Sequence, residues 1–366
     1  MEAPSIRFRL GGPGGAVALT GDPVGFSSLA AAEAAVRSGT HGDVVAGSIP
    51  FDPATETPSL YLGRRETGMP GGPAASAWGG FRPEVVFNDT AIAEYIDLFH
   101  HVLPLLRTPG SGLEKIVIAR SERFSYTDAV DPLGMYERIA QLYPQVHSYF
   151  VEHLDAPGVY TMGASPELFL RKTGDVVAMT PLAGTVPRNP LLSEEADRAQ
   201  ARAELYTCKY LDEHGHLAEF MIKGLAALCT GLSYPDQPEL VAAPGVWHLG
   251  TPITGRLSDP DTPIAELVSA LHPSPAVCGV PQAEALRLIT AHESARRYYG
   301  GLVGWFDRAG DCEFYMALRG LEFDSRERHL TLRAGGGVVA GSRLATEFAE
   351  TSAKLASMRR VLGITP

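Results

Sequence analysis

The sequence has few cysteines, and their spacing indicates neither a disulfide framework nor a metal site. Its 366 residues include four cysteines, none of them in a Cys-x-x-Cys pair. This usage is typical of a protein from a reducing compartment. The four are Cys208, Cys229, Cys278 and Cys312.

Long hydrophobic runs and an excess of positive charge are also absent. No apolar run reaches about 18 residues, and the N-terminus has no apolar signal core, so no transmembrane helix or secretion signal is predicted. The net charge is −11, which argues against nucleic acid or an anionic membrane as the main partner. An acidic small substrate is still compatible with this charge, because a pocket's local field need not follow the net charge. We expect a cytoplasmic protein that uses no nucleic acid and no membrane.

What the sequence does have is enough apolar material for a large core, with 45% hydrophobic and 20% charged residues. Its length permits one large domain or two medium ones. Periodicity and turn residues predict alternating helices and many short strands. We expect helices near 28–37, 90–106, 131–143, 192–230, 263–271 and 282–297, strands at 44–49, 115–120, 146–151, 159–162, 176–179, 246–257, 301–306 and 312–323, and a surface loop at 68–80. The strands are too many, and too antiparallel in spacing, for a doubly wound sheet, which favours an α+β fold of large packed sheets with helices outside.

The C-terminal stretch from Leu332 to Leu355 carries the first chemical signal. It is predicted to contain the end of a strand, a glycine run at 335–337 that could bind an anion through bare N–H groups, and a helix with Ser342 as its N-cap. On that helix Glu347, Glu350 and Lys354 share one face. They could hold a divalent cation beside an anionic substrate, or they could form a solvated face with an ordinary salt bridge.

A second carboxylate, Glu213, lies four residues before Leu217 at the end of an apolar helical stripe. A carboxylate at the end of a buried stripe needs a partner, because an unpaired buried charge is costly. Its position therefore favours a nearby cation.

Several motifs, in order along the chain, resemble those of the chorismate-utilising enzymes, the family of isochorismate, salicylate, anthranilate and aminodeoxychorismate synthases. The matching motifs are Gly163-Ala-Ser-Pro-Glu167, Pro181-Leu-Ala-Gly-Thr185, Glu213-His214, His248-Leu249, Leu271-His-Pro-Ser-Pro-Ala-Val-Cys-Gly279, Tyr299-Gly-Gly-Leu-Val-Gly-Trp305, Ala317-Leu-Arg319 and residues 332–355. In addition, Ile49-Pro-Phe-Asp-Pro53 resembles the isochorismate synthase branch.

The resemblance implies one chorismate-binding domain over residues 1–366, more variable in 1–110 and carrying the core motifs in 111–366. It implies two large stacked antiparallel sheets flanked by helices, and a monomer. It also implies a Mg²⁺ ion, with Glu213 and Glu350 as ligands and Glu347 as a further or water-mediated one. Such a set suits Mg²⁺, which usually takes few protein carboxylates and keeps some water.

The resemblance also assigns residues to the substrate. Tyr299 and Arg319 match positions that hold the enolpyruvyl carboxylate, and an arginine fork suits a carboxylate. His248 and His272 lie in matching motifs and are expected near the enolpyruvyl side chain, although each could instead be a structural histidine. The other expected substrate contacts are Gly184, Thr185, Gly335, Gly337 and Lys354.

Lys115 indicates the branch of the family. In the branch that adds water to chorismate, a lysine at this place in the strand looks like the general base, and Glu167 would be the partner acid. Burial in a closed pocket lowers the pKa of a lysine and allows it to act as a base. The expected activity is that of an isochorismate synthase. A salicylate synthase, which adds pyruvate elimination, and a non-catalytic chorismate-binding homologue are the alternatives, and the pathway that uses the product (siderophore, menaquinone or another) stays open.

Overall fold

The computed structural model describes residues 6–364, except 14, 20–22, 40, 67–82, 86–88, 128–129 and 244. The loop predicted at residues 68–80 lies outside the described residues. The helices of the described chain are α1 (Leu29–Ser38), α2 (Asp89–Arg107), α3 (Pro132–Leu142), α4 (Glu194–Leu205), α5 (Cys208–Ala226), α6 (Ile264–Leu271), α7 (Gln282–His292) and α8 (Leu344–Val361). None of these described helices combines the length and the apolar character that a membrane-spanning segment requires.

One large antiparallel sheet holds ten strands of the described chain. Its strands are β1 (Phe8–Gly12), β2 (Gly15–Leu19), β6 (Arg65–Glu66), β7 (Glu84–Val85), β8 (Lys115–Ser125), β9 (His147–Glu152), β10 (Val159–Ser165), β18 (Gly279–Val280), β21 (Gly320–Asp324) and β22 (His329–Val338). Their order is β18-β8-β22-β21-β10-β9-β1-β2-β6, and β7 also pairs with β8.

The second large sheet holds nine described strands, and a small third sheet holds three. The nine are β3 (Val24–Phe26), β4 (Val44–Ile49), β5 (Ser59–Gly63), β11 (Leu168–Thr173), β12 (Val176–Met179), β14 (Cys229–Ser233), β17 (Ile253–Leu257), β19 (Leu302–Asp307) and β20 (Cys312–Met316), in the order β14-β17-β12-β11-β20-β19-β4-β5-β3. The small sheet contains β13 (Leu182–Pro187), β15 (Glu239–Ala243) and β16 (Val246–Gly250), with β16 in the middle.

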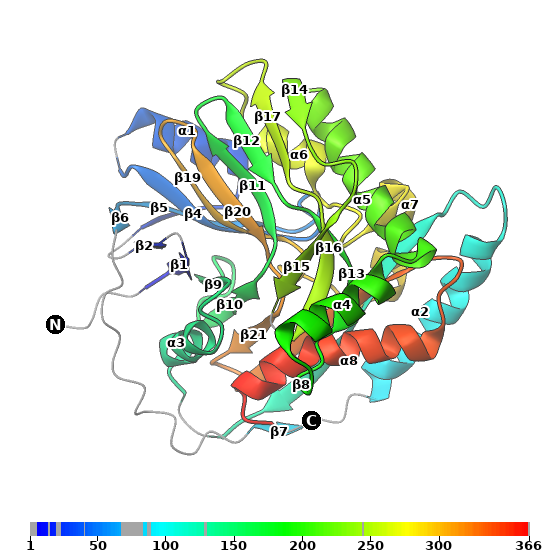
Figure 1. Ribbon diagram of the computed structural model, residues 1–366. Helices are drawn as coiled ribbons and strands as arrows, with labels where there is room; N and C mark the ends of the chain where they lie inside the picture. The colour runs from blue at the N-terminus through cyan, green and yellow to red at the C-terminus, as the bar shows by residue number, and fades with distance from the viewer. Residues whose placement is uncertain are drawn as a thin grey trace.

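The two large sheets stack on one another, with helices outside (Figure 1). Phe8, Leu10 and Tyr149 of the ten-stranded sheet share a buried cluster with Val303 and Tyr315 of the nine-stranded sheet. On the outer face of the ten-stranded sheet, α3 and α8 bury an apolar face against its strands. The predicted α+β fold with two stacked antiparallel sheets is confirmed.

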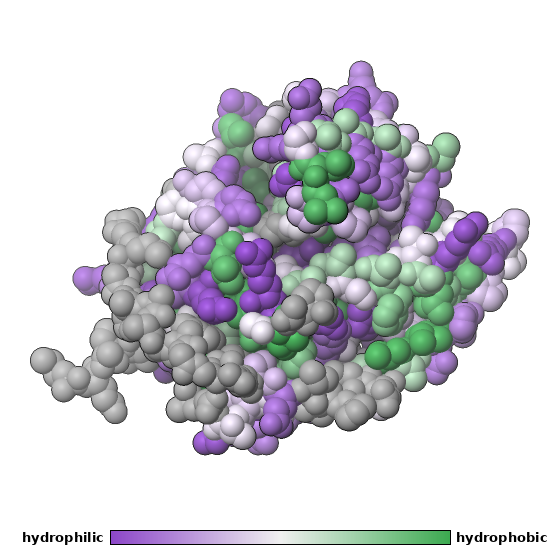
Figure 2. Space-filling model, turned by 60° about the horizontal axis from the view of Figure 1, so that its bottom comes forward, coloured by the Kyte–Doolittle hydropathy of each residue, from purple (hydrophilic) through white to green (hydrophobic). Residues whose placement is uncertain are grey.

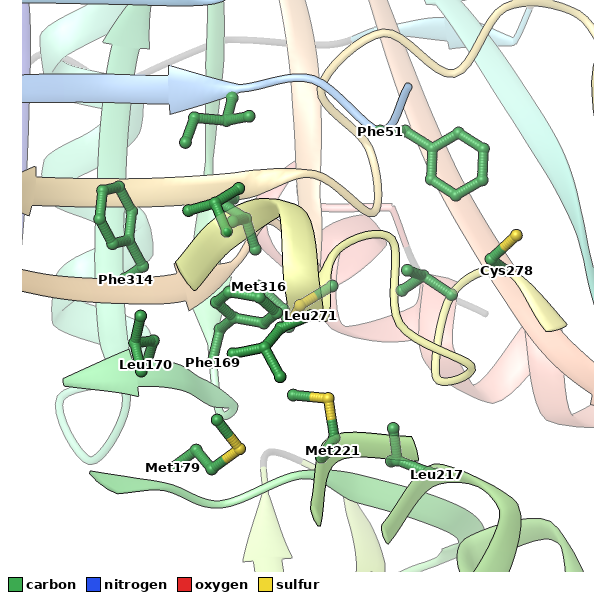
Figure 3. Close-up of a cluster of buried hydrophobic side chains, with 14 of the residues drawn as sticks. Phe51, Phe169, Leu170, Met179, Leu217, Met221, Leu271, Cys278, Phe314 and Met316 are labelled. Atoms are coloured by element: carbon green, nitrogen blue, oxygen red, sulfur yellow. The ribbon is translucent and has the colours of Figure 1, made fainter. Parts of the chain in front are cut away.

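The largest core cluster joins the nine-stranded sheet to the helices that cover it. Figure 3 shows Phe169 and Met316 from the sheet beside Leu271 of α6, with Met221 of α5 close by. Phe169, Met316, Leu271 and Met221 are all at most 2% exposed. This packing fixes α5, which carries Glu213, against the strands.

Several predicted boundaries are wrong. The expected strand at 246–257 is two strands in different sheets, β16 and β17, because Pro252 lacks the N–H that would continue a ladder. The expected strand at 312–323 is likewise β20 and β21, interrupted at Arg319, whose φ of 48° is left-handed. In addition, α7 ends at His292 rather than near residue 297.

The C-terminal stretch also differs from its prediction. The glycine run is no loop, because β22 continues through it to Val338 and pairs with β8 along its whole length. Ser342 is not the N-cap of α8: that position belongs to Arg343, and the Ser342 hydroxyl instead accepts the N–H of Val339.

The surface drawn in Figure 2 has hydrophobic residues in separate patches among hydrophilic ones. Scattered apolar residues of this kind are normal on a folded protein. Leu191, in the connection before α4, is 92% exposed, so its substitution can be compared with substitutions of buried leucines.

We predict that Leu217→Ala, in the fully buried stripe of α5, lowers the free energy of unfolding by about 2–5 kcal/mol, because it leaves a cavity. The matched control is Leu191→Ala, for which the change should stay within about 0.5 kcal/mol. Urea unfolding of both variants measures this. Equal losses in the two variants would contradict the assignment of the core.

Candidate functional site

A cavity with about 700 Å³ of space, its open mouth included, lies where the small sheet meets β8 and β22. The predicted site residues that line it are Glu167, Gly184, Thr185, Glu213, His248, Tyr299, Arg319, Gly335, Gly337 and Lys354. They come from segments far apart in the sequence, and the fold brings them to one place.

Lys115 lies just behind this wall and is completely buried. Its Nζ is 3.4 Å from Oε1 of Glu213, which does line the cavity. The strand alternation places Lys115 on the same face of β8 as Val117, another lining residue. The partner that the buried Glu213 requires is therefore the ammonium group of Lys115.

Gly337 makes room for this ion pair. It pairs with Val117 of β8, and a Cβ at this position would lie 2.4 Å from Oε1 of Glu213 and 3.0 Å from Cε of Lys115. A side chain there would displace one of the two charged groups. The glycine run is therefore part of a strand and not an anion-binding loop. Because Gly337 has no side chain, it leaves space for the charged groups of Lys115 and Glu213.

Glu347, Glu350 and Lys354 lie on one face of α8, as predicted. Lys354 donates to Oε1 of Glu350 at 2.6 Å and to the carbonyl oxygen of Gly335 at 2.9 Å. Glu347 is completely buried, and its Oε1 accepts from Nζ of Lys209 at 2.9 Å. Burial and the neighbouring charge of Glu350 raise the pKa of Glu347, and the ammonium of Lys209 partly offsets this.

In the described part of the chain, no three His, Cys, Asp or Glu side chains are close enough together to hold a metal ion as they stand. The three glutamates nevertheless fit a magnesium ion by their chemistry, since Mg²⁺ prefers oxygen ligands and needs only one or two carboxylates. Oε2 of Glu347 is buried and has no hydrogen-bond partner. A Cβ at Gly336 would lie 3.5 Å from Oε1 of Glu350 and 3.7 Å from this same Oε2, so both oxygens face one point beside the strand.

Glu167 enters the cavity from the turn between β10 and β11 and is 5% exposed. Burial raises its pKa to about 7, and the N–H of Leu182, which donates to its Oε1 at 3.3 Å, opposes the shift together with the charge of Lys115. A carboxyl group with this pKa holds its proton for part of the time near neutral pH. It can therefore donate a proton to a bound molecule.

His248 holds Arg319 in place. Nδ1 of His248 lies 3.1 Å from the carbonyl oxygen of Gly184 and from Oγ1 of Thr185, and Nε2 lies 3.3 Å from Nη2 of Arg319. Burial lowers the pKa of His248 well below its ordinary value, so the ring is neutral and its Nε2 can accept from the guanidinium. Nη1 of Arg319 is buried without a partner, which leaves a donor for an anionic ligand.

Tyr299 lines the cavity together with Arg319, and the Tyr299 hydroxyl lies 3.2 Å from where a Cβ on Gly335 would be. His272, by contrast, does not line the cavity. Its ring is buried beside Phe169, and its Nε2 is 2.9 Å from the carbonyl oxygen of Pro50. The structure therefore places His272 in the core, in the position of a structural histidine.

Two arginines for which the sequence predicts no role also line the cavity, Arg296 and Arg333. Arg296 is 4% exposed and donates to Glu293, Val117 and Val277, so its donors are used within the protein. The spacing of Glu293 and Arg296 is the only signal in the sequence, and many ordinary ion pairs share it. Arg333 stands on the cavity face of β22, two residues before Gly335, a place that the strand alternation could have indicated.

Known proteins resemble this chain over most of its length. The sequence model described as "Chorismate binding enzyme" matches residues 85–363. The isochorismate synthase EntC of Escherichia coli (strain K12) is 32% identical over 343 residues, which cover 90% of this chain and 84% of that protein. The isochorismate synthase DhbC of Bacillus subtilis (strain 168) is 37% identical over 265 residues, covering 71% and 66%.

A solved structure supports the same relationship. A Bacillus anthracis protein assigned as a 2,3-dihydroxybenzoate-specific isochorismate synthase superimposes with a TM-score of 0.86 at 28% identity. The superposition covers 98% of this chain and 97% of that one. The whole architecture, N-terminal strands included, is therefore shared.

We predict that Glu167 makes the protein less stable as pH rises from about 4.5 to 7. Its pKa is raised by burial, so the folded state binds more protons than the unfolded chain in this window, and the free energy of unfolding falls with pH. Glu167→Gln, which mimics the protonated group, should lack this fall, which is on the order of 2–3 kcal/mol. The measurement is urea unfolding of the wild-type and Glu167→Gln proteins at pH 5 and pH 8. The same pH dependence in both proteins would contradict the raised pKa of Glu167.

Proposed function

The chain belongs to the chorismate-binding enzymes, and we propose that it is an isochorismate synthase, which converts chorismate to isochorismate. The observation that carries this proposal is that a buried lysine, Lys115, and a glutamic acid with a pKa of about 7, Glu167, lie at the same cavity. The same cavity contains Arg319, whose Nη1 has no hydrogen-bond partner. A general base and a general acid at one ring are what the exchange of a hydroxyl group requires.

The proposed reaction begins when Lys115, in its neutral amine form, removes a proton from a water molecule that attacks C2 of the ring. The new C2–O bond forms while the ring double bond migrates and the C4–O bond breaks. Glu167 gives its proton to the departing hydroxyl group, which leaves as water. One water enters and one leaves, so the product is an isomer of the substrate.

The two carboxylates of chorismate would be bound at opposite ends of the cavity. Arg319, held by the neutral His248, and Tyr299 suit the enolpyruvyl carboxylate. Lys354 and the side-chain-free strand at Gly335 and Gly337 suit the ring carboxylate, and Gly184 and Thr185 form the facing wall.

We place Mg²⁺ at Glu213 and Glu350, with Glu347 as a further ligand. When bound, the ion supplies positive charge that orients the ring carboxylate and offsets its charge. Support comes from the all-oxygen donor set and from the unpartnered Oε2 of Glu347. The ammonium groups that pair with these carboxylates in the structure would be rearranged on metal binding.

We predict that the protein, incubated with chorismate and Mg²⁺, produces isochorismate. A chelator should stop the reaction, because without the ion the glutamates of the site repel the ring carboxylate of the substrate. Chromatography of the products is the measurement. Salicylate with pyruvate would instead identify a salicylate synthase. Chorismate binding without turnover would identify a non-catalytic homologue.

We predict that Lys115→Gln lowers kcat by about 10²–10⁴-fold, because the general base is lost while a polar group still reaches Glu213. The matched control is Lys172→Gln on β11, since Lys172 is also buried, at 2% exposed, but donates to the carbonyl oxygen of Gly310 away from the cavity. The control should keep wild-type turnover. A fully active Lys115→Gln protein would rule out the proposed base.

A further inference from the structure

Strand β8 carries, besides Lys115, an arginine that the proposed reaction does not use. Arg120 ends the sequence Lys115-Ile-Val-Ile-Ala-Arg120 and is 4% exposed. By the alternation of a strand it points to the face opposite Lys115, toward α8. A buried guanidinium is costly unless its donors are all bound, so its partners indicate what it is for.

Those partners lie on one turn of α8. Nε of Arg120 donates to Oγ1 of Thr351 at 2.9 Å, and Nη2 donates to Oγ of Ser352 at 2.7 Å. The guanidinium carbon also lies 4.3 Å from the centre of the Phe348 ring. On the strand side, Nη1 donates to Oε1 of Glu122 at 3.0 Å. The planar fork is thus bound on both sides, to β8 and to α8.

The turn that Arg120 holds is the one that carries the site. Thr351 is completely buried and follows Glu350 directly, four residues after Glu347 and three before Lys354. It therefore stands in the middle of the helix face that presents both carboxylates and the ammonium. A shift of α8 along β8 would move all three groups relative to Lys115 and Glu213.

We propose that Arg120 is a positioning residue that fixes α8 against β8, and thereby sets the affinity of the glutamate cluster for a divalent cation. This inference rests on the proposed function, because it takes Glu213, Glu347 and Glu350 to be the metal ligands. It goes beyond that function in assigning control of the ligands to a residue on the far side of the strand, which touches neither substrate nor metal.

A lysine cannot reproduce the arrangement, although it keeps the charge, because one ammonium cannot bind Thr351, Ser352 and Glu122 with the geometry of a fork. Removing the acceptors on the helix is the complementary change. Thr351→Val combined with Ser352→Ala leaves Arg120 and its charge in place but releases α8.

The experiment measures Mn²⁺ binding to the full-length protein by electron paramagnetic resonance, with and without chorismate that has reached equilibrium with its product. We expect Arg120→Lys to weaken Mn²⁺ binding by up to about 10–100-fold, the range for losing a group bonded directly to a metal ligand. The Thr351→Val/Ser352→Ala protein should lose affinity similarly. Arg120→Lys added to that protein should cause little further loss, since both changes break the same link.

Arg359 supplies the matched control, because it joins the same strand to the same helix outside the site. Its Nε and Nη2 donate to Oε2 and Oε1 of Glu122 at 2.8 and 2.5 Å, two turns beyond Thr351. Arg359→Lys should lower the melting temperature but leave Mn²⁺ affinity at the wild-type value. If Arg120 were purely structural, its loss of Mn²⁺ affinity would only follow its loss of stability, and Arg359→Lys at equal loss of stability would lose the same affinity.

The outcomes separate the two proposals. Wild-type Mn²⁺ affinity in both Arg120→Lys and Thr351→Val/Ser352→Ala overturns the positioning role and leaves the proposed function intact. Equal loss of affinity in Arg359→Lys at equal loss of stability overturns it as well. Failure of the wild-type protein to bind Mn²⁺ under either condition overturns the metal site, and with it the role of Arg120.

Discussion

The buried ion pair between Lys115 and Glu213 constrains the rest of the site. Two charges removed from water are stable only when they are paired well, and the loss of either would leave the other uncompensated. The pair joins β8 to α5, two elements from different parts of the chain, and it needs the space that Gly337 leaves. The ladder of β8 and β22, with ten paired residues, keeps that space in register.

Charge compensation extends from this pair to the whole site. Glu213 faces Lys115, Glu347 faces Lys209 and Glu350 faces Lys354, so each carboxylate has an ammonium partner before any ligand arrives. Arg319 differs, because its neighbour His248 is neutral and one of its nitrogens has no partner. The site thus contains three carboxylates that are already paired and one guanidinium nitrogen, Nη1 of Arg319, that has no partner in the described chain.

The sequence was informative where local chemistry decides the structure. The face shared by Glu347, Glu350 and Lys354 follows from helical spacing, and the burial of Glu213 follows from the apolar stripe beside it. The architecture and most of the cavity lining followed from motifs that occur in order. The sequence indicated that Glu213 needs a charged partner but not that the partner is Lys115. The two residues lie on α5 and β8, which come together only in the tertiary fold.

What could not be predicted depends on long-range pairing. Apolar and polar residues alternate through 312–323 in the same way whether the segment forms one strand or two strands in different sheets. The sequence pattern therefore could not reveal the break at Arg319. The glycine run resembled a loop because glycine disfavours strands, and only its pairing with β8 overrides that preference. His272 shares a motif with cavity residues, yet its bond to Pro50 draws it into the core.

The first strands of the chain have a consequence for its boundaries. β1 pairs with β9 and β4 pairs with β19, so the N-terminal segment is woven into both large sheets although its sequence carries few of the site's motifs. A shortened protein starting at α2 would uncover two interior strands and offer their free N–H and C=O groups to neighbouring molecules. The N-terminal strands therefore cover the edges of β9 and β19, and a protein without them would tend to self-associate.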